Sequence, residues 1–78
     1  MFFMKVITFY KYVEIEDPES FAKEHLSFCK NLGLKGKILV SKEGINGGIT
    51  GKDSVINSYK NGLTEYSKFR DIQFKETF

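Results

Sequence analysis

His25 and Cys29 are the side chains of this sequence best suited to bind a metal ion, because imidazole and thiolate groups are typical zinc ligands. They lie four residues apart, a spacing that puts both on the same side of a helix. The chain has one histidine and one cysteine in all, so no second pair completes a ligand set. Both also fall within the apolar arc of the predicted helix. The sequence therefore favours a core cysteine and a half-buried histidine, and we expect no metal site.

Cys29 is also a poor candidate for a catalytic nucleophile. A reactive cysteine is usually a thiolate stabilised by a helix N-terminus or a nearby cation. Cys29 instead comes near the C-terminal, negative end of the helix predicted over 18–32. No base stands beside a nucleophile elsewhere in the sequence. We therefore expect no catalytic residue and no cofactor in this chain, and no enzymatic activity from this chain alone.

A glycine-rich segment over 39–50 predicts two strands that meet at a tight turn. Its central run is Glu43-Gly44-Ile45-Asn46-Gly47, in which the glycines allow positive φ or close backbone approach. Lysines surround this hairpin, at Lys35, Lys37, Lys42 and Lys52. The net charge of +2 is too small to argue for nucleic-acid binding by itself. These lysines either solvate a strand pair and protect a sheet edge, or they form a patch that faces RNA.

Local patterns predict six elements in the order βαββαβ. Asp17 and Pro18 are typical of a helix start, and Gly33 is typical of a helix end. The expected strands cover 5–13, 36–41, 45–50 and 71–75, and the expected helices cover 18–32 and 53–66. This order predicts an α+β, ferredoxin-like (split βαβ) sandwich: a four-stranded antiparallel sheet with two helices on one face. Right-handed crossovers make the first and third strands the central pair.

The same pattern divides the residues between the core and the open face of the sheet. We expect a single domain over 1–78 whose core contains Phe9, Phe21, Ile38, Val40, Ile49, Ile56, Leu63 and Phe74. Alternation along the first strand then points Tyr10 and Tyr12 away from the helices. Neighbouring strands add Asn46, Thr50, Gln73 and Lys75 to that face.

An exposed sheet that carries aromatic side chains is how RNA-recognition modules stack bases. Those modules also carry aromatics on the third strand, where this chain has Gly47 and Gly48, so a stand-alone module of that kind is disfavoured. Alternatively, Tyr10 and Tyr12 pack against a following domain. The sequence leaves both interpretations open.

Several short segments, in the same order along the chain, suggest a family. They are Phe9-Tyr10-Lys11-Tyr12-Val13, Asp17-Pro18, Leu32-Gly33-Leu34-Lys35-Gly36, Glu43-Gly44-Ile45-Asn46-Gly47 and Phe74-Lys75-Glu76. Together they resemble the N-terminal domain of the rhodanese-related tRNA uridine hydroxylases, which oxidise the wobble uridine of certain tRNAs. Where that family usually has threonine after the Asn-Gly pair, this chain has Gly48.

The resemblance implies an acylphosphatase-like form of the ferredoxin-like fold and an accessory, tRNA-positioning role. It places the oxygen-dependent chemistry and its cysteine in a rhodanese-like domain that the sequence does not contain. The expected partners are that domain and tRNA, and the surface that meets them is expected to include Tyr10, Tyr12, Lys42, Asn46 and Lys52.

Other expectations follow from the residues themselves. Acylphosphatase activity is disfavoured because the segment after the first strand, 13–18, is acidic and lacks the arginine and glycines of an anion loop. With no apolar run long enough to span a membrane, we expect a cytoplasmic protein. We also expect a monomer. The alternative function is a free-standing ferredoxin-like module that binds proteins and has no enzymatic activity.

Overall fold

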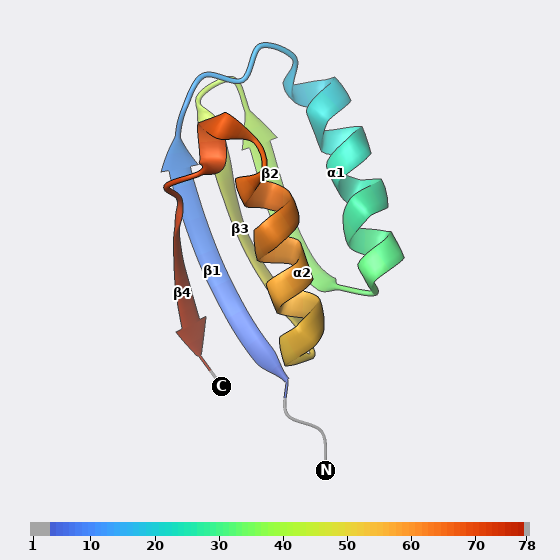
Figure 1. The fold of residues 1–78 in the computed structure, drawn as a ribbon. Helices are drawn as coiled ribbons and strands as arrows, with labels where there is room; N and C mark the ends of the chain where they lie inside the picture. The colour runs from blue at the N-terminus through green and yellow to red at the C-terminus, as the bar shows by residue number, and fades with distance from the viewer. Residues whose placement is uncertain (1–3, 78) are drawn as a thin grey trace.

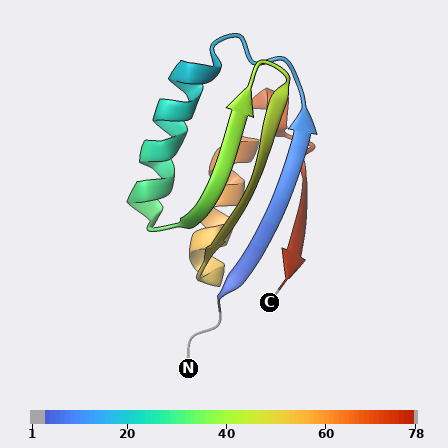
Figure 2. The ribbon, with the colours of Figure 1, turned by 180° about the vertical axis from the view of Figure 1, so that it is seen from behind.

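The structure, a computed structural model, describes residues 4–77. Its elements follow one another as β1 (Lys5–Tyr12), α1 (Pro18–Leu32), β2 (Lys35–Ser41), β3 (Gly44–Gly51), α2 (Asp53–Thr64), the short 3-10 helix η1 (Ser67–Phe69) and β4 (Gln73–Thr77). Both α-helices lie on one side of the sheet (Figure 1), and the view from behind shows the other side of the sheet without a covering layer (Figure 2). The predicted α+β, ferredoxin-like sandwich is confirmed.

The sheet has the strand order β2-β3-β1-β4, and each neighbouring pair is antiparallel. The predicted central pair, β1 with β3, is therefore confirmed. In its register Tyr10 lies opposite Asn46 and Thr8 lies opposite Gly48. This register decides which side chains share the open face, because residues directly opposite each other in a ladder point to the same side.

The start and end of α1 are the ones that the sequence predicted. Asp17 accepts a hydrogen bond from the backbone N–H of Ser20 through its Oδ1 atom, at 3.1 Å, and Pro18 is the first helical residue. Gly33 ends the helix with a φ of 72°, the left-handed conformation that glycine adopts without strain. Its backbone N–H donates to carbonyls of the last turn, so the helix end is satisfied.

The C-terminal part of the chain differs from the prediction in its boundaries. α2 ends at Thr64 rather than at 66, and β4 covers 73–77 rather than 71–75. The cause is η1, which the sequence pattern did not predict. It turns the chain so that Phe69 and Ile72 are buried, and the strand begins only after Ile72. The remaining strand ends agree with the predicted ones to within one residue.

The core lies between the helices and the inner face of the sheet. Its buried hydrophobic residues are Ile7, Phe9, Ile15, Ile45, Ile49, Ile56, Tyr59, Leu63, Phe69 and Ile72. Of the predicted core, Phe9, Ile49, Ile56 and Leu63 are confirmed as buried. The other four predicted members are only partly buried and pack around this centre: Phe21, Ile38, Val40 and Phe74.

Candidate functional site

The open face of the sheet carries two exposed tyrosines from β1. Strand alternation buries Ile7 and Phe9 against the helices and directs Tyr10 and Tyr12 the other way. Tyr10 is 68% exposed and Tyr12 is 81% exposed. Their rings stand edge to face, with centroids 5.9 Å apart, so each keeps a face available to solvent. Exposed aromatic faces of this kind are suited to stacking on nucleobases.

Tyr10 stands in a row of side chains that crosses the sheet. Its partner on β3 is Asn46 and its partner on β4 is Gln73, while Asn46 in turn lies opposite Leu39 of β2. Leu39 is 58% exposed. A shallow depression of about 390 Å³ lies over the hairpin end of this face, and its lining includes both tyrosines, Leu39 and Asn46. The site therefore combines apolar contact area with one amide that can donate and accept hydrogen bonds.

The next row across the sheet supplies positive charge. Lys37, Gly48, Thr8 and Lys75 lie side by side in the registers of the four strands. Both lysines are exposed. Among residues 4–77, the strand positions that point away from the helices carry no aspartate or glutamate. The open face is therefore positively charged beside the two tyrosines, which favours an anionic partner.

The structure separates the two lysines that the sequence analysis placed at one surface. Lys42 lies in the turn before β3, and Lys52 lies after its other end. The strand between them is eight residues long, so roughly 25 Å separates the two positions. Tyr10, Tyr12 and Asn46 are brought together, with Lys42 near their end of the sheet and Lys52 at the far end. Both lysine side chains are exposed.

The hairpin motif that suggested the family has mainly a structural role. The carbonyl of Glu43 accepts a hydrogen bond from the N–H of Val13 at 2.9 Å, which fastens the β1–α1 connection to the turn. Gly44 has a φ of 152°, and a Cβ there would lie 2.0 Å from the carbonyl oxygen of Lys11. Ile45 is buried. Asn46 is the motif's side chain on the open face.

Gly47 and Gly48 differ in the direction they face. A Cβ on Gly47 would point into the core, 2.9 Å from Ile38 and 3.0 Å from Phe9. Gly48 lies on the open face, where a Cβ would meet Thr8 at an ordinary 3.5 Å. Gly47 therefore serves the packing of two core side chains. Only Gly48 leaves backbone accessible to a ligand on this face.

His25 and Cys29 lie on the helical side, away from this face. His25 is buried, not half-buried as expected, and its Nε2 atom shares a hydrogen bond of 2.8 Å with the Tyr59 hydroxyl. Burial lowers the pKa of His25. Cys29 is the half-buried member of the pair rather than a core residue, and burial raises its pKa. Within the described residues, no three His, Cys, Asp or Glu side chains gather as metal ligands.

Leu39 and Lys37 are two further members of the open face that were not predicted from the sequence. The signal was present, because assigning Ile38 and Val40 to the core requires their neighbours to point outward. Among residues 4–77, no helix is long and apolar enough to cross a membrane.

Two helices on one face of an antiparallel βαββαβ sheet define a domain with the acylphosphatase-like form of the ferredoxin-like fold. The chain belongs to the UPF0176 acylphosphatase-like domain family, whose family model matches residues 4–78. This membership agrees with the resemblance drawn from the hairpin and the flanking segments. The connection after β1 is acidic and buries Ile15.

The chain is also similar to curated proteins named tRNA uridine(34) hydroxylase. The proteins from Enterococcus faecalis and Staphylococcus saprophyticus are each 51% identical to it over 71 residues. The protein from Listeria welshimeri is 48% identical over 71 residues. Each match covers 91% of this chain and 22% of the relative. The chain thus spans about a fifth of the length of these relatives.

Proposed function

We propose that this chain is the accessory domain of an enzyme that hydroxylates uridine 34 of tRNA, and that its open sheet face positions the RNA. The observation that carries the proposal is the 51% identity to tRNA uridine(34) hydroxylases over 91% of the chain. The exposed Tyr10 and Tyr12 support the RNA-positioning part, together with the lysines beside them.

The chemistry of the reaction belongs, in this proposal, to a rhodanese-like domain of the same protein, which uses molecular oxygen and its own cysteine. The domain described here holds no cofactor and contributes no reacting group. His25 is buried against Tyr59 and faces neither the open-face pair Tyr10 and Tyr12 nor solvent. The raised pKa of Cys29 keeps its thiol protonated at neutral pH. The whole protein acts in the cytoplasm, where it meets tRNA.

The open face binds RNA by two kinds of contact. Unpaired bases stack on Tyr10 and Tyr12, which is worth about 1 to 3 kcal/mol per stacked base. Lys37 and Lys75 contact phosphates, and Asn46 hydrogen-bonds a base edge or ribose. Because few phosphates are contacted, the isolated domain binds RNA with low affinity, and this affinity falls as the salt concentration rises. An unpaired loop is preferred over a duplex, since paired bases cannot lie flat on the tyrosine rings.

A binding assay with a labelled RNA hairpin tests this proposal. The probe has the sequence of an anticodon arm that begins its anticodon with uridine, and the reference probe has the same stem closed by a short structured loop. Wild-type chain should prefer the first probe, and Tyr10→Ala with Tyr12→Ala should remove the preference. Equal affinity for both probes in the wild type would reject loop recognition by this face.

The lysines provide a second comparison in the same assay. Lys37→Glu with Lys75→Glu changes the row beside the tyrosines, whereas Lys42→Glu with Lys52→Glu changes charge by the same amount at the two ends of β3. We expect the first pair to weaken binding more. Each phosphate contact that is lost should reduce the slope of log affinity against log salt by about 0.7. A larger loss from the second pair would move the RNA contact to the strand ends.

The second candidate function is the free-standing ferredoxin-like module that binds proteins. The partly uncovered inner side chains Ile38 and Val40 at the β2 edge favour it. The genomic reading frame separates the two functions. Continuation past Phe78 into a cysteine-bearing domain supports the hydroxylase, and a stop codon at that point supports the module.

A further inference from the structure

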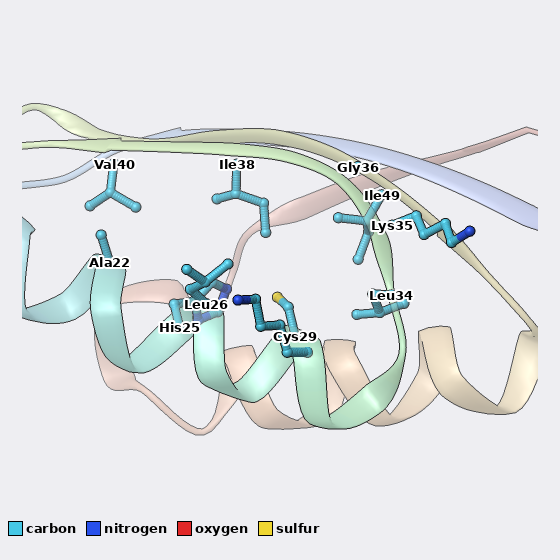
Figure 3. Close-up of a pocket in the computed structure, with 11 residues that line it drawn as sticks. Ala22, His25, Leu26, Cys29, Leu34, Lys35, Gly36, Ile38, Val40 and Ile49 are labelled. Atoms are coloured by element: carbon cyan, nitrogen blue, oxygen red, sulfur yellow. The ribbon is translucent and has the colours of Figure 1, made fainter.

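An apolar groove of about 350 Å³ runs between α1 and the inner face of β2, at the edge of the sheet. Ala22, Leu26 and Cys29 line it from the helix, and Ile38 and Val40 line it from the strand. Figure 3 shows these two sets of side chains pointing toward each other across the gap. Leu26 is 56% exposed. The groove lies on the opposite side of the sheet from Tyr10 and Tyr12, so it is separate from the proposed RNA face.

The groove exists because α1 does not cover β2 completely. Inward-facing residues of β3 are sealed, with Ile45 2% and Ile49 3% exposed. The corresponding inward residues of β2, Ile38 and Val40, are only partly buried. Apolar side chains that are left half-covered beside an edge strand are typical of a surface that a partner completes.

The two edges of the sheet, β4 and β2, differ in their charges and ion pairs. At β4, Glu76 pairs with Lys60 and Lys5, and the Lys60 ammonium lies 5.4 Å from the centre of the Phe74 ring. Such charges and ion pairs blunt an edge against further strands. β2 carries Lys35 and Lys37, which disfavour pairing with another basic strand but attract an acidic one, and neither forms an ion pair among residues 4–77. Its outer backbone groups remain available for pairing.

The mouth of the groove is positively charged. Its lining includes Lys30 from the last turn of α1 and Lys35 from the start of β2 and no carboxylate, and the register directs the Lys35 side chain to the open-face side of this edge, opposite Thr50. Neither lysine pairs with an acidic side chain in the described part of the chain. An occupant that carries acidic residues beside its apolar ones would meet a cation on each side of this edge, Lys35 on the open-face side and Lys30 on the helical side. A second copy of this chain would instead bring further lysines to the same edge.

We propose that the β2 edge and its groove bind an extended, apolar and acidic protein segment by strand addition. The segment pairs its backbone with the outer edge of β2 and inserts alternate apolar side chains between Leu26, Ile38 and Val40. Its alternate acidic residues point to the open-face side of β2 and meet Lys35, while Lys30 lies at the helix side of the groove. This mode of recognition takes affinity from main-chain hydrogen bonds and specificity from the pocket beneath them.

A pair of synthetic peptides tests the proposal. The first alternates isoleucine or valine with glutamate, and the second has lysine in place of each glutamate. Binding to the chain is followed by fluorescence anisotropy, and the alkylation rate of Cys29, the single cysteine, reports whether the groove is filled. The acidic peptide should bind and slow alkylation, and the basic peptide should do neither. Failure of the acidic peptide to bind, or equal binding of both, would overturn the proposal.

Matched charge reversals locate the contact. Lys30→Glu with Lys35→Glu should weaken binding of the acidic peptide about tenfold, since each reversal turns an attraction into a repulsion. Lys68→Glu with Arg70→Glu makes the same change in charge away from the groove and should leave the affinity unchanged. Equal losses from both pairs would mean that the peptide responds only to net charge.

Sedimentation of the wild-type chain without peptide tests whether a second copy of the chain fills the groove instead. The proposal expects a monomer across the concentrations used for binding. A dimer that Leu26→Asp converts to a monomer would show that a second copy fills the groove, and it would overturn the proposed partner.

Discussion

The Nε2 atom of His25 lies 2.8 Å from the hydroxyl oxygen of Tyr59, and both side chains are buried between the two α-helices. The two residues are 34 positions apart in the sequence, so this hydrogen bond joins α1 to α2. Phe21 stacks on the imidazole ring at a centroid distance of 5.1 Å. A polar pair enclosed in this way fixes how the helices sit against each other and makes the fold sensitive to proton binding.

The His25 site predicts a loss of stability in mild acid. Burial holds the His25 pKa below its ordinary value of 6.5, so the unfolded chain binds the proton more readily than the folded chain. Its contribution to stability is complete above pH 6.5 and decreases as the pH falls below that value. Urea denaturation between about pH 5 and pH 7.5 should follow this course.

His25→Gln provides the control for that measurement. The variant should show little change in stability across the same pH window, whatever its overall stability. Glu76 acts in a separate and more acidic window, because the Lys60 and Lys5 ammonium groups hold its pKa below 4.5. Identical pH profiles for wild type and His25→Gln would contradict this account of the site.

Tyr59→Phe removes the hydroxyl and leaves the imidazole without its hydrogen-bond partner. A buried polar group that loses its partner costs about 1 to 3 kcal/mol, so the free energy of unfolding should fall by that amount. Tyr66→Phe is the matched control, since Tyr66 is 45% exposed and should change stability by less than about 0.5 kcal/mol. Chemical denaturation at neutral pH compares the two, and equal effects would argue against the buried hydrogen bond.

Substitution of two β3 glycines by alanine should change the stability of the fold to very different extents. At Gly44 the new Cβ would lie 2.0 Å from the Lys11 carbonyl oxygen, and φ is 152°. Gly44→Ala should therefore destabilise the fold by roughly 3 kcal/mol. At Gly48 the nearest neighbour of a Cβ is the Thr8 methyl group at 3.5 Å, so Gly48→Ala should stay within about 1 kcal/mol of wild type. Thermal melts of both variants measure the difference, and a tolerated Gly44→Ala would show that the hairpin can shift.

Cys29 should react slowly with alkylating reagents at neutral pH. Burial raises its pKa, and the thiol lies near the negative end of α1, so little thiolate is present. The alkylation rate of Cys29 should increase with pH. It should still be increasing at a pH where a free cysteine has already reached its maximal rate. Rapid, stoichiometric labelling at neutral pH would contradict the inert assignment and the expectation that this chain alone hydroxylates nothing and transfers no sulfur.

The fold was predictable because local signals and the global topology agree. Asp17, Pro18 and Gly33 delimit α1, and alternation along β1 separates Phe9 from Tyr10. The end of α2 was not predictable in this way. Burial of Phe69 is a tertiary effect that turns the chain into η1. The helical periodicity of the sequence continues through Tyr66 and contains no sign of this turn.

The candidate site was predictable only in part. Tyr10, Tyr12 and Asn46 follow from alternation and register, and the structure brings them together. The burial of His25 depends on Tyr59, a partner on another helix that no local pattern reveals. Gly62, which costs helix propensity, is explained only by the Phe28 ring of α1, whose Cζ atom would lie 2.3 Å from a Cβ at that position.

The measurement that tests the central claim most directly is uridine 34 hydroxylation by the full-length protein that contains this domain. The protein is expressed in a strain without tRNA uridine hydroxylase, and modified tRNA is quantified by mass spectrometry. Tyr10→Ala with Tyr12→Ala should lower hydroxylation at least about tenfold at limiting enzyme, because stacking on both rings is lost. Tyr10→Phe with Tyr12→Phe keeps the rings and should retain activity. Wild-type hydroxylation by the alanine variant, at equal protein level and unchanged melting temperature, would contradict the claim that this face positions the RNA.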